Sequence, residues 1–399
     1  MNPAEQAAPM LPLKGIVVLE MAHTVMGPTA GLVLGDLGAE VIRVEPAPLG
    51  DRTRRLRGFA SGFFSYFNRN KKSLCIDLKT PEGMEIAHKL IAKADVLVEN
   101  FAPGAMDRVG LGWEELQRLN PRLILCSLKG FLPGPYEKRP ALDEIVQYMT
   151  GLAYMTGPPG KPLRAGSSVV DIMGGVMGVV GVLAALRQRD ADGVGRKVTS
   201  ALYESAAFLV SQHMTGEAMT GKPAPPMPAR DSAWAVYETF PTADGTPLFI
   251  GITSNNHWKA FCTNFGREDL LADARFDENE NRVLFRDILR PAVAEAMVKY
   301  SVAELSAKLE AIGIPFSPVR RPGELFDDPQ LLAHGRMMHT RMPNGKWVNL
   351  PNMPFEIDGQ SPTLRHQPPE AGEHTDEILG ALGYSAGAIV ALREQGKVK

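Results

Sequence analysis

The sequence is poor in cysteine and histidine, and neither residue type occurs in a metal-binding pattern. The three cysteines, Cys75, Cys126 and Cys262, lie far apart and form no CxxC pair. This spacing excludes the common zinc motifs and is typical of a reducing compartment, so we expect a cytoplasmic protein. None of the eight histidines stands in an HxxxH spacing. We therefore expect no metal site.

The sequence also lacks a charge excess and a membrane-spanning run. Its 43 Lys and Arg residues nearly balance its 45 Asp and Glu residues, which leaves a formal net charge of −2. This balance gives no electrostatic reason to expect a nucleic acid or an anionic membrane as a partner. No continuous apolar run reaches the ~20 residues of a membrane span. The first residues lack the basic region and apolar core of a secretory signal.

Two common enzyme motifs are missing as well. The four glycines between residues 27 and 38 do not spell GxGxxG, so a dinucleotide site is unsupported. The paired serines at residues 167–168 are not in a GxSxG elbow, which disfavours a hydrolase triad. Arginines cluster at residues 52–57, where a phosphate site and a solvated loop are equally compatible with the sequence.

What is present is an alternation of strand and helix patterns in the first half of the chain. Strands are predicted at residues 16–19, 40–45, 73–78, 95–99 and 123–128, and helices at 27–37, 80–94 and 113–119. This alternation predicts an α/β fold with a Rossmann-like, doubly wound parallel sheet. Ligands of such sheets bind outside the carboxyl ends of the strands. Those ends are followed here by His23, Asn100 and Lys129.

A proline-dense stretch at residues 221–230 marks a linker, and the pattern changes after it. A hairpin turn at residues 243–246 and three later helix patterns, at 257–264, 283–299 and 302–312, predict a smaller α+β domain. The expected organisation has four parts. They are a first part of the large domain with the candidate nucleophile (1–220), a linker (221–235), the small domain (236–325), and a return linker with the C-terminal part of the large domain (326–399).

One carboxylate stands out between a strand-like run and a helix pattern. The apolar, β-branched run that begins at Leu163 ends at Asp171, and Gly174, Gly175 and an apolar helix pattern at residues 176–186 follow. An aspartate there can cap the helix, and the local pattern alone favours this role. It can also act as a nucleophile when it is desolvated and correctly aimed. The local sequence leaves both roles open.

Several strings along nearly the whole chain carry a resemblance to a known family. They are residues 12–20, 38–46, 70–73, 95–104 (DVLVENFAPG), 127–131 (SLKGF), Asp171 with its glycines, 240–245 and 372–375 (GEHT). Together they resemble the class III CoA-transferase family, which includes formyl-CoA transferase, carnitine CoA-transferase and α-methylacyl-CoA racemase. The string at residues 95–104 is especially specific to that family.

The resemblance implies an acyl-CoA:carboxylate CoA-transferase in which Asp171 is the nucleophile. Its carboxylate would attack a donor thioester, possible donors including succinyl-CoA, and pass through a mixed anhydride and an aspartyl-CoA thioester. Gly174 and Gly175 would let backbone N–H groups approach the oxyanion. CoA is then a substrate and not a permanently bound cofactor. Residues that match the family's CoA contacts are His23, Thr24, Val25, Met26, Ile76, Asp77, Lys79, Asn100, Phe101, Ala102 and Arg108.

Departures from the family pattern narrow the activity. Leu142 occupies the position of the racemases' catalytic histidine and cannot transfer a proton, which disfavours an α-methylacyl-CoA racemase or epimerase. Asp143 is expected to accept hydrogen bonds and not to act as a base. A contact arginine of some relatives falls at Pro46, with Arg52 or Arg54 as candidate replacements.

The acceptor and the assembly follow from the same resemblance. The prolines at residues 223–228 stand where formyl-CoA transferases carry a glycine-rich loop, so we expect a dicarboxylate such as succinate or glutarate, and not oxalate or formate. Arg164 and Arg230 are candidate partners for its distal carboxylate.

The family's homodimers are interlocked, each chain forming a ring threaded through the other. A CoA-binding protein without catalysis is a further alternative, which the retained Asp171 disfavours.

Overall fold

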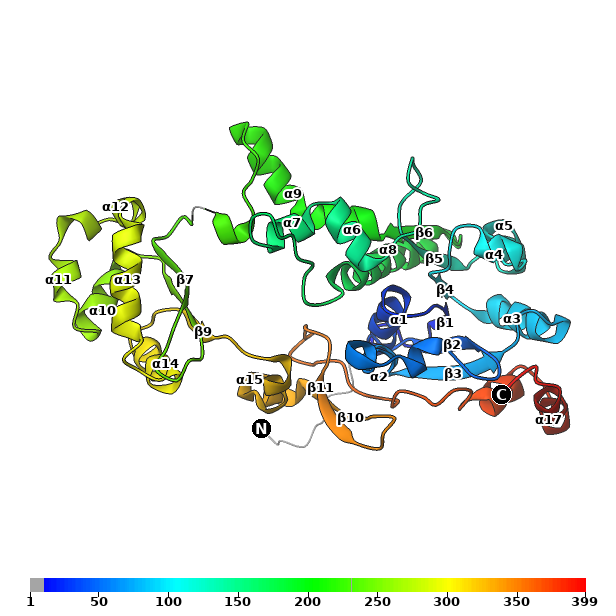
Figure 1. Cartoon of the computed structure of the whole chain (residues 1–399). Helices are drawn as coiled ribbons and strands as arrows, with labels where there is room; N and C mark the ends of the chain where they lie inside the picture. Colours follow the sequence, from blue (N-terminus) through cyan, green and yellow to red (C-terminus); the bar gives the residue numbers. More distant parts are fainter. Residues whose placement is uncertain (1–10, 231) are drawn as a thin grey trace. The chain divides into compact units, whose positions relative to one another are not determined.

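A six-stranded sheet forms the centre of the larger of two units into which the chain divides. The computed structural model describes residues 11–230 and 232–399, so the first ten residues of the predicted large domain, and Asp231 of the predicted linker, lie outside the described residues. The larger unit comprises the chain up to Pro228 together with Phe326–Lys399, and the smaller unit is Ala229–Leu325 (Figure 1). The chain thus leaves the larger unit within the predicted linker and returns to it near the predicted position.

All six strands of the central sheet are parallel. They are β1 (Val17–Met21), β2 (Glu40–Pro46), β3 (Lys71–Ile76), β4 (Val96–Glu99), β5 (Ile124–Lys129) and β6 (Lys197–Ala201). Their order is β3-β2-β1-β4-β5-β6, and every neighbouring pair is parallel. This is a doubly wound sheet whose strand order reverses between β1 and β4. The predicted Rossmann-like architecture is therefore confirmed.

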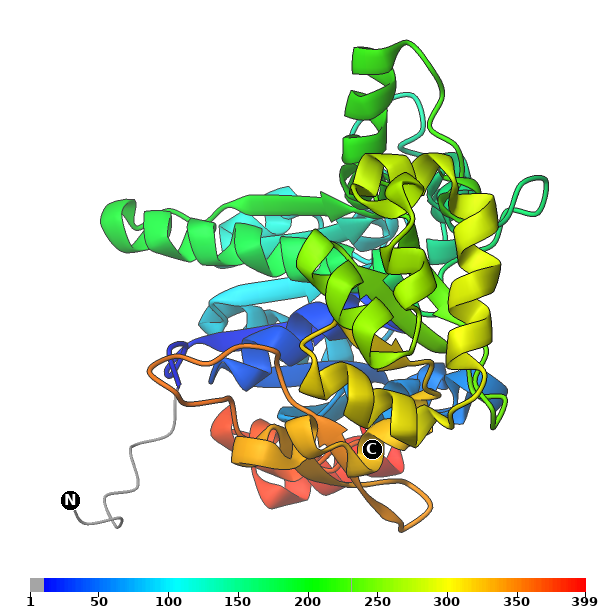
Figure 2. The same cartoon turned by 90° about the vertical axis from the view of Figure 1, so that its left-hand side faces the viewer.

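Helices cover both faces of this sheet because successive strand residues point to opposite sides. Val18 packs in a core with α1 (Met26–Asp36) and α8 (Val169–Asp192). Its neighbour Leu19 packs on the other face with α3 (Pro81–Lys93), α5 (Trp113–Leu119) and the C-terminal helices α16 (Thr375–Ala381) and α17 (Ala386–Glu394). Figure 2 shows these C-terminal helices, in red, on the side of the strands away from α8.

The remaining elements of the larger unit are short, apart from α9. They are α2 (Phe63–Phe67), α4 (Ala105–Arg108), α6 (Asp143–Met149), α7 (Leu152–Thr156), α9 (Leu202–Thr220), α15 (Pro329–Leu332), β10 (Met337–Arg341) and β11 (Trp347–Pro351). The last two strands form an antiparallel hairpin. The helices α6 and α7 lie in a stretch for which the sequence predicted no element.

The smaller unit packs helices against a three-stranded antiparallel sheet. Its elements are β7 (Val236–Phe240), β8 (Leu248–Ile252), α10 (Asn255–Asn264), α11 (Glu268–Leu271), α12 (Asn279–Leu284), α13 (Arg286–Met297), α14 (Val302–Ala311) and β9 (Phe316–Pro318). The predicted hairpin between β7 and β8 is confirmed, and Gly245 in its turn has a φ of 79°. The single helix predicted at residues 283–299 is wrong, because Phe285 leaves the helical conformation and separates α12 from α13.

The helix α8 differs from two sequence-based expectations. It begins at Val169, so the apolar run before Asp171 ends inside the helix and forms no strand. Among the described residues, it is also the one helix long and apolar enough to cross a membrane, with a mean hydropathy of 2.2 over its best 18-residue stretch. Within the larger unit α8 is the crossover helix between β5 and β6, and it packs in the core beside α1.

Candidate active site

Asp171 lies in the first turn of α8, but its side chain does not cap that helix. The N-terminal residue Ser168 makes no side-chain capping bond either. The cap comes from Asp143, at the start of α6, whose Oδ2 atom accepts hydrogen bonds from the backbone N–H groups of Val170 (2.9 Å) and Asp171 (3.0 Å). The capping role favoured for Asp171 by the local sequence is therefore wrong, and its carboxylate is left for other chemistry.

Asp143 is itself held rigidly. It is buried, and its Oδ1 atom accepts a hydrogen bond from Nε2 of Gln147, while Oε1 of Gln147 accepts one from the N–H of Ala165 at 2.9 Å. The predicted hydrogen-bonding role of Asp143 is confirmed by these contacts. The preceding residue, Leu142, is 66% exposed and offers no proton-transfer group.

The environment of Asp171 changes its protonation. Desolvation by the surrounding protein and the nearby negative charge of Asp143 raise the pKa of Asp171 to about 7. Near neutral pH the carboxylate is therefore populated but poorly solvated. A desolvated carboxylate is a better nucleophile than one in water, so this environment suits covalent catalysis.

Gly174 and Gly175 permit close packing of two helices. A Cβ atom on Gly175 would lie 2.6 Å from the carbonyl oxygen of Met26, and one on Gly174 would lie 2.4 Å from Cε of the same methionine. Both glycines are buried in α8, beyond its first four residues, so their N–H groups belong to the helical hydrogen-bond ladder. The predicted oxyanion role is not supported, because neither glycine has a free N–H. Their evident role is to bring the first turns of α1 and α8 together.

The topological switch point of the sheet brings two predicted CoA-binding segments together. His23 follows β1 and Asn100 follows β4, and these strands are neighbours. Oδ1 of Asn100 accepts a hydrogen bond from the N–H of His23 at 3.0 Å, and Nδ2 of Asn100 donates to its carbonyl oxygen at 2.9 Å. The ring of His23 lies 6.1 Å from that of Phe101. Burial lowers the pKa of His23, and the charge of Arg52 acts in the same direction.

The other predicted contact residues fall into two groups. Val25, Met26 and Ile76 have buried side chains in the core, so they shape the wall of the site and cannot present a side chain to a ligand in this conformation. Lys79, Ala102 and Arg108 are exposed, and Thr24, Asp77, Asn100 and Phe101 are partly exposed. These residues follow the carboxyl ends of β1, β3 and β4, where ligands of doubly wound sheets bind. Their contacts with CoA stay predictions.

The two candidate replacements for the missing arginine differ in availability. Arg54 donates to both carboxylate oxygens of Glu45, at 2.7 and 2.6 Å, and to the carbonyl of Pro369. Burial alone would raise the pKa of Glu45, but these bonds and the charges of Arg54 and Arg43 lower it to about 2. Arg52 is exposed, and among the described residues its side chain makes no hydrogen bond or ion pair. Arg52 is therefore the better candidate.

The candidate partners of a distal carboxylate lie in different units. Arg164 pairs with Glu144 at 2.9 Å, and both side chains are partly exposed. Arg230 belongs to the smaller unit.

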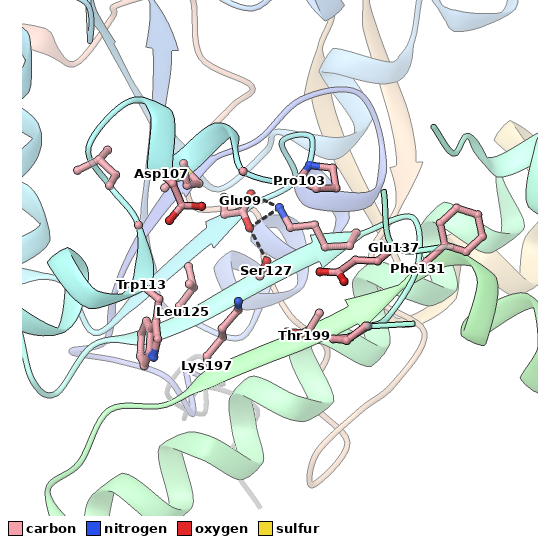
Figure 3. A pocket seen from close by; sticks show the side chains of 16 residues that line it. Glu99, Pro103, Asp107, Trp113, Leu125, Ser127, Phe131, Glu137, Lys197 and Thr199 are labelled. Carbon is pink, nitrogen blue, oxygen red and sulfur yellow. Dashed lines mark hydrogen bonds and ion pairs between the residues drawn. The ribbon is translucent and has the colours of Figure 1, made fainter. Parts of the chain in front are cut away.

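A pocket lies beside β4 and β5, and Glu99, Ser127 and Lys129 are among the residues that line it (Figure 3). It encloses about 810 Å³, including the solvent space at its mouth. Nζ of Lys129 donates to Glu99 at 2.7 Å and to the carbonyl oxygen of Phe101 at 2.8 Å, and Glu99 accepts from the N–H of Phe101 at 3.0 Å. Ser127 donates to Glu99 as well. The sequence strings contain these residues, but only the fold shows that they fix the Phe101 backbone.

Within residues 11–230 and 232–399, no group of three or more His, Cys, Asp or Glu side chains could hold a metal ion. All three cysteines are free and buried.

Comparison with known proteins identifies relatives over almost the full chain. Residues 13–375 match the model of CoA-transferase family III. The chain is 33% identical to the succinate–glutarate CoA-transferase of Agrobacterium fabrum, over 93% of this chain and 96% of that protein. It is 32% identical to the formyl-CoA:oxalate CoA-transferase of Rhodopseudomonas palustris, over 96% of each. A CAIB/BAIF family protein from Brucella suis has a similar structure, with a TM-score of 0.84, 32% identity, and coverage of 93% of this chain and 99% of that one.

Proposed function

The chain belongs to CoA-transferase family III, and we propose that it transfers CoA from an acyl-CoA to a dicarboxylic acid through covalent intermediates on Asp171. The observation that carries this mechanism is the state of Asp171. Its pKa is raised to about 7, and its backbone is fixed by Asp143 at the carboxyl edge of the sheet. A positioned, poorly solvated carboxylate is suited to attack a thioester.

The proposed reaction has two symmetrical halves. An Asp171 oxygen attacks the thioester carbonyl, the C–S bond breaks, and CoA leaves as a thiolate. A mixed anhydride of Asp171 and the donor acid remains. The thiolate then attacks the Asp171 acyl carbon, which releases the donor acid and leaves an aspartyl-CoA thioester. The acceptor carboxylate attacks that thioester, and CoA leaves again to give a second mixed anhydride, between Asp171 and the acceptor. The CoA thiolate then attacks the acceptor acyl carbon of this anhydride and forms the product thioester. The Asp171 carboxylate is regenerated, and no net proton is consumed.

The relatives' names support dicarboxylates as substrates. Relatives from Agrobacterium fabrum and mouse are named for succinate or succinyl-CoA and glutarate. We propose succinyl-CoA as the donor and a dicarboxylate of similar length as the acceptor. Arg164 can bind the distal carboxylate, because its pair with Glu144 is partly exposed and therefore weak and exchangeable.

We propose that the working form is a homodimer. On α8, Met177, Val180 and Leu183 are all at least 36% exposed, and Val180 is 56% exposed. An exposed apolar side on a helix of this hydropathy marks an interaction surface, and a second copy of the chain can cover it. The interlocked form implied by the resemblance would thread two such chains. Light scattering should give twice the chain mass, and Val180→Asp should shift it toward the monomer. A monomeric wild type would refute the dimer.

Two further parts of the proposal concern how CoA binds and where in the cell the protein is located. We propose that CoA binds only as a substrate, with Arg52, Lys79 and Arg108 as the exposed cations that face its phosphates. We also propose a cytoplasmic location, since all three cysteines are free and buried thiols.

Trapping the aspartyl intermediate tests the mechanism. The enzyme is incubated with succinyl-CoA and treated with borohydride, which reduces an aspartyl thioester to the alcohol and so converts Asp171 to homoserine. Peptide mass spectrometry should find this change at Asp171, and not at Asp190 or Asp192 of the same helix. Asp171→Ala is the matched control and should show no modified peptide.

An unmodified Asp171 with succinyl-CoA, glutaryl-CoA and other acyl-CoA donors would refute the covalent mechanism. The racemase alternative has its own measurement, which is exchange of the α-proton of a 2-methylacyl-CoA in heavy water. We expect no exchange, because Leu142 leaves no histidine beside Asp143.

A further inference from the structure

One residue of the switch-point loop has a strained backbone. Thr24 has a φ of 65°, in the left-handed region. Side chains branched at Cβ rarely adopt that region, because Cβ approaches the neighbouring carbonyl oxygen. Of the four described non-glycine residues with positive φ, Thr24 is the one with a branched Cβ. Such strain persists only where surrounding contacts enforce it.

Thr53 supplies the enforcing contact. Its Oγ1 atom accepts a hydrogen bond from the N–H of Thr24 at 3.2 Å and donates to Oδ1 of Asp51 at 2.9 Å. Asp51 also accepts the N–H of Thr53 at 2.8 Å and pairs with Arg43. Arg43 in turn donates to the carbonyl oxygen of Ala22 at 3.0 Å. The residues on both sides of His23 are thus tied to one buried cluster.

This cluster is anchored in the sheet. Arg43 of β2 pairs with Glu20 of β1, and Glu20 pairs with Lys71 of β3 at 2.6 Å. All three side chains are fully buried. Removing one partner of a buried ion pair strongly destabilises a protein. The cluster therefore gives Thr53 a rigid base.

The loop that Thr53 holds lies against the helix of the nucleophile. Ile172, the residue after Asp171, packs against the small apolar cluster that contains Val25. Met26 lies against Gly174, one turn into α8. We propose that Thr53 is a positioning residue for the transferase reaction: its hydroxyl holds Thr24 in the left-handed conformation and thereby fixes the wall beside Asp171. The kinetic part of this inference rests on the proposed function.

Two substitutions at one position test the hydroxyl. Thr53→Val keeps the shape of the side chain and loses the bond to Thr24. It should lower kcat roughly tenfold or more, because small misplacements of a reacting group are costly. The KM for the acyl-CoA should change less than about threefold, since the Thr53 side chain is buried. Thr53→Ser retains the hydroxyl and should recover kcat to within about threefold of the wild type.

A matched control is available in the β10–β11 hairpin. Thr340 is buried and also donates one hydroxyl hydrogen bond, to the carbonyl oxygen of Met338 at 2.9 Å. Thr340→Val removes a buried threonine hydroxyl that donates to a backbone carbonyl oxygen, as a control for the loss of a buried hydroxyl in general, and kcat should stay unchanged. A loss in Thr340→Val equal to that in Thr53→Val would refute a specific role for Thr53.

A double-mutant cycle separates positioning from general damage. Glycine adopts the left-handed region without penalty, so the hydroxyl of Thr53 matters less once Thr24 is replaced by glycine. In the Thr24→Gly background, Thr53→Val should cost less than about threefold in kcat. An equal loss in both backgrounds would overturn the proposal.

Amide hydrogen exchange measures how well the loop at residues 22–26 is held, and it needs no substrate. In Thr53→Val, the amides of residues 22–26 should exchange faster than in the wild type, and those of β5 should not. Unchanged exchange in residues 22–26 refutes the proposal whatever the activity. If the wild type transfers no CoA but the exchange result is as expected, the proposed function has failed and the role of Thr53 in holding the loop stands.

Discussion

The carboxylate of Asp143 accepts a hydrogen bond from the backbone N–H of Asp171 at 3.0 Å. The same residue is a cause of the raised pKa of the Asp171 carboxyl, because its negative charge disfavours a second one nearby. The Asp143 side chain therefore fixes the backbone of the candidate nucleophile. Its negative charge also raises the energy of the Asp171 carboxylate, which makes that carboxylate more reactive. These two effects can be separated by substitution.

Asp143→Asn should shift the acid limb of the pH–rate profile to lower pH. Asparagine can still accept a backbone hydrogen bond through Oδ1, but it carries no charge, so the pKa of Asp171 falls. Asp143→Ala removes the cap too and should lower kcat by roughly 100-fold or more. The profile of kcat/KM against pH measures both. Glu217→Gln, which removes an exposed carboxylate of α9, is the control, and an equal shift there would contradict the assignment.

The wild-type enzyme should gain activity as the pH rises through about 7. The pKa of Asp171 is raised to about 7, and only the ionised form can attack a thioester. We expect kcat/KM to rise tenfold per pH unit well below this value and to level off above it. A profile that is flat from pH 5 to pH 9, with chemistry rate-limiting, would contradict this role of Asp171.

Asp171→Asn should stabilise the protein, and more so at high pH. A carboxyl whose pKa is raised by folding binds a proton more tightly in the native state, so its stability contribution falls as the pH rises from about 4 to above 7. Asparagine cannot ionise, so it removes this pH-dependent loss of stability. The unfolding temperature of Asp171→Asn should exceed that of the wild type by a few degrees at pH 8 and by little at pH 4.5. The opposite order, with a larger gain at pH 4.5, would contradict the raised pKa.

Arg52→Ala and Arg54→Ala should have different effects. Arg52 makes no hydrogen bond or ion pair among the described residues, so its loss should raise the KM for the acyl-CoA about three- to tenfold and leave the unfolding temperature unchanged. Arg54 is held by Glu45, whose side chain is fully buried, so its loss should lower the unfolding temperature. Lys substitution at residue 52 should recover much of the KM. Equal effects of both alanine variants would contradict the distinction.

The sequence predicted the sheet and the meeting of its strand ends, because these depend on local patterns and general rules. Alternating strands and helices imply parallel strands, and parallel strands place His23 and Asn100 at one edge. The role of Asp143 could not be predicted in this way. Asp143 lies 28 residues from Asp171 in the sequence, and the two residues make their hydrogen bond only because the fold brings α6 beside α8. The local pattern instead assigned the cap to Asp171, since aspartate is common at helix starts.

The glycines of α8 illustrate a second limit of the sequence. Glycine after a candidate nucleophile indicates either a free N–H or a close approach, and the sequence does not distinguish them. Gly175 faces the carbonyl oxygen of Met26 and the side chain of Thr29, so the requirement is space. The strain at Thr24 is a similar case, because a threonine in a loop gives no indication of its φ angle.

Gly175→Ala should therefore reduce both stability and activity. A Cβ atom would lie 2.6 Å from the Met26 carbonyl oxygen, and backbone cannot move aside as a flexible side chain can. We expect a loss of about 1–3 kcal/mol in the free energy of unfolding, as for other overpacked positions. The helices must separate locally, and this displaces the turn that carries Asp171. The kcat should fall with the stability.

Gly216 of α9 is the matched control, because a Cβ atom there would meet no atom within 4 Å. In a helix interior, Gly→Ala without a clash stabilises by roughly 0.5–1 kcal/mol. Gly216→Ala should thus raise the unfolding temperature, while Gly175→Ala lowers it. If both variants gained stability, the packing of α8 against α1 would tolerate a methyl group at residue 175. The close approach of the two helix starts would then not be what requires glycine there.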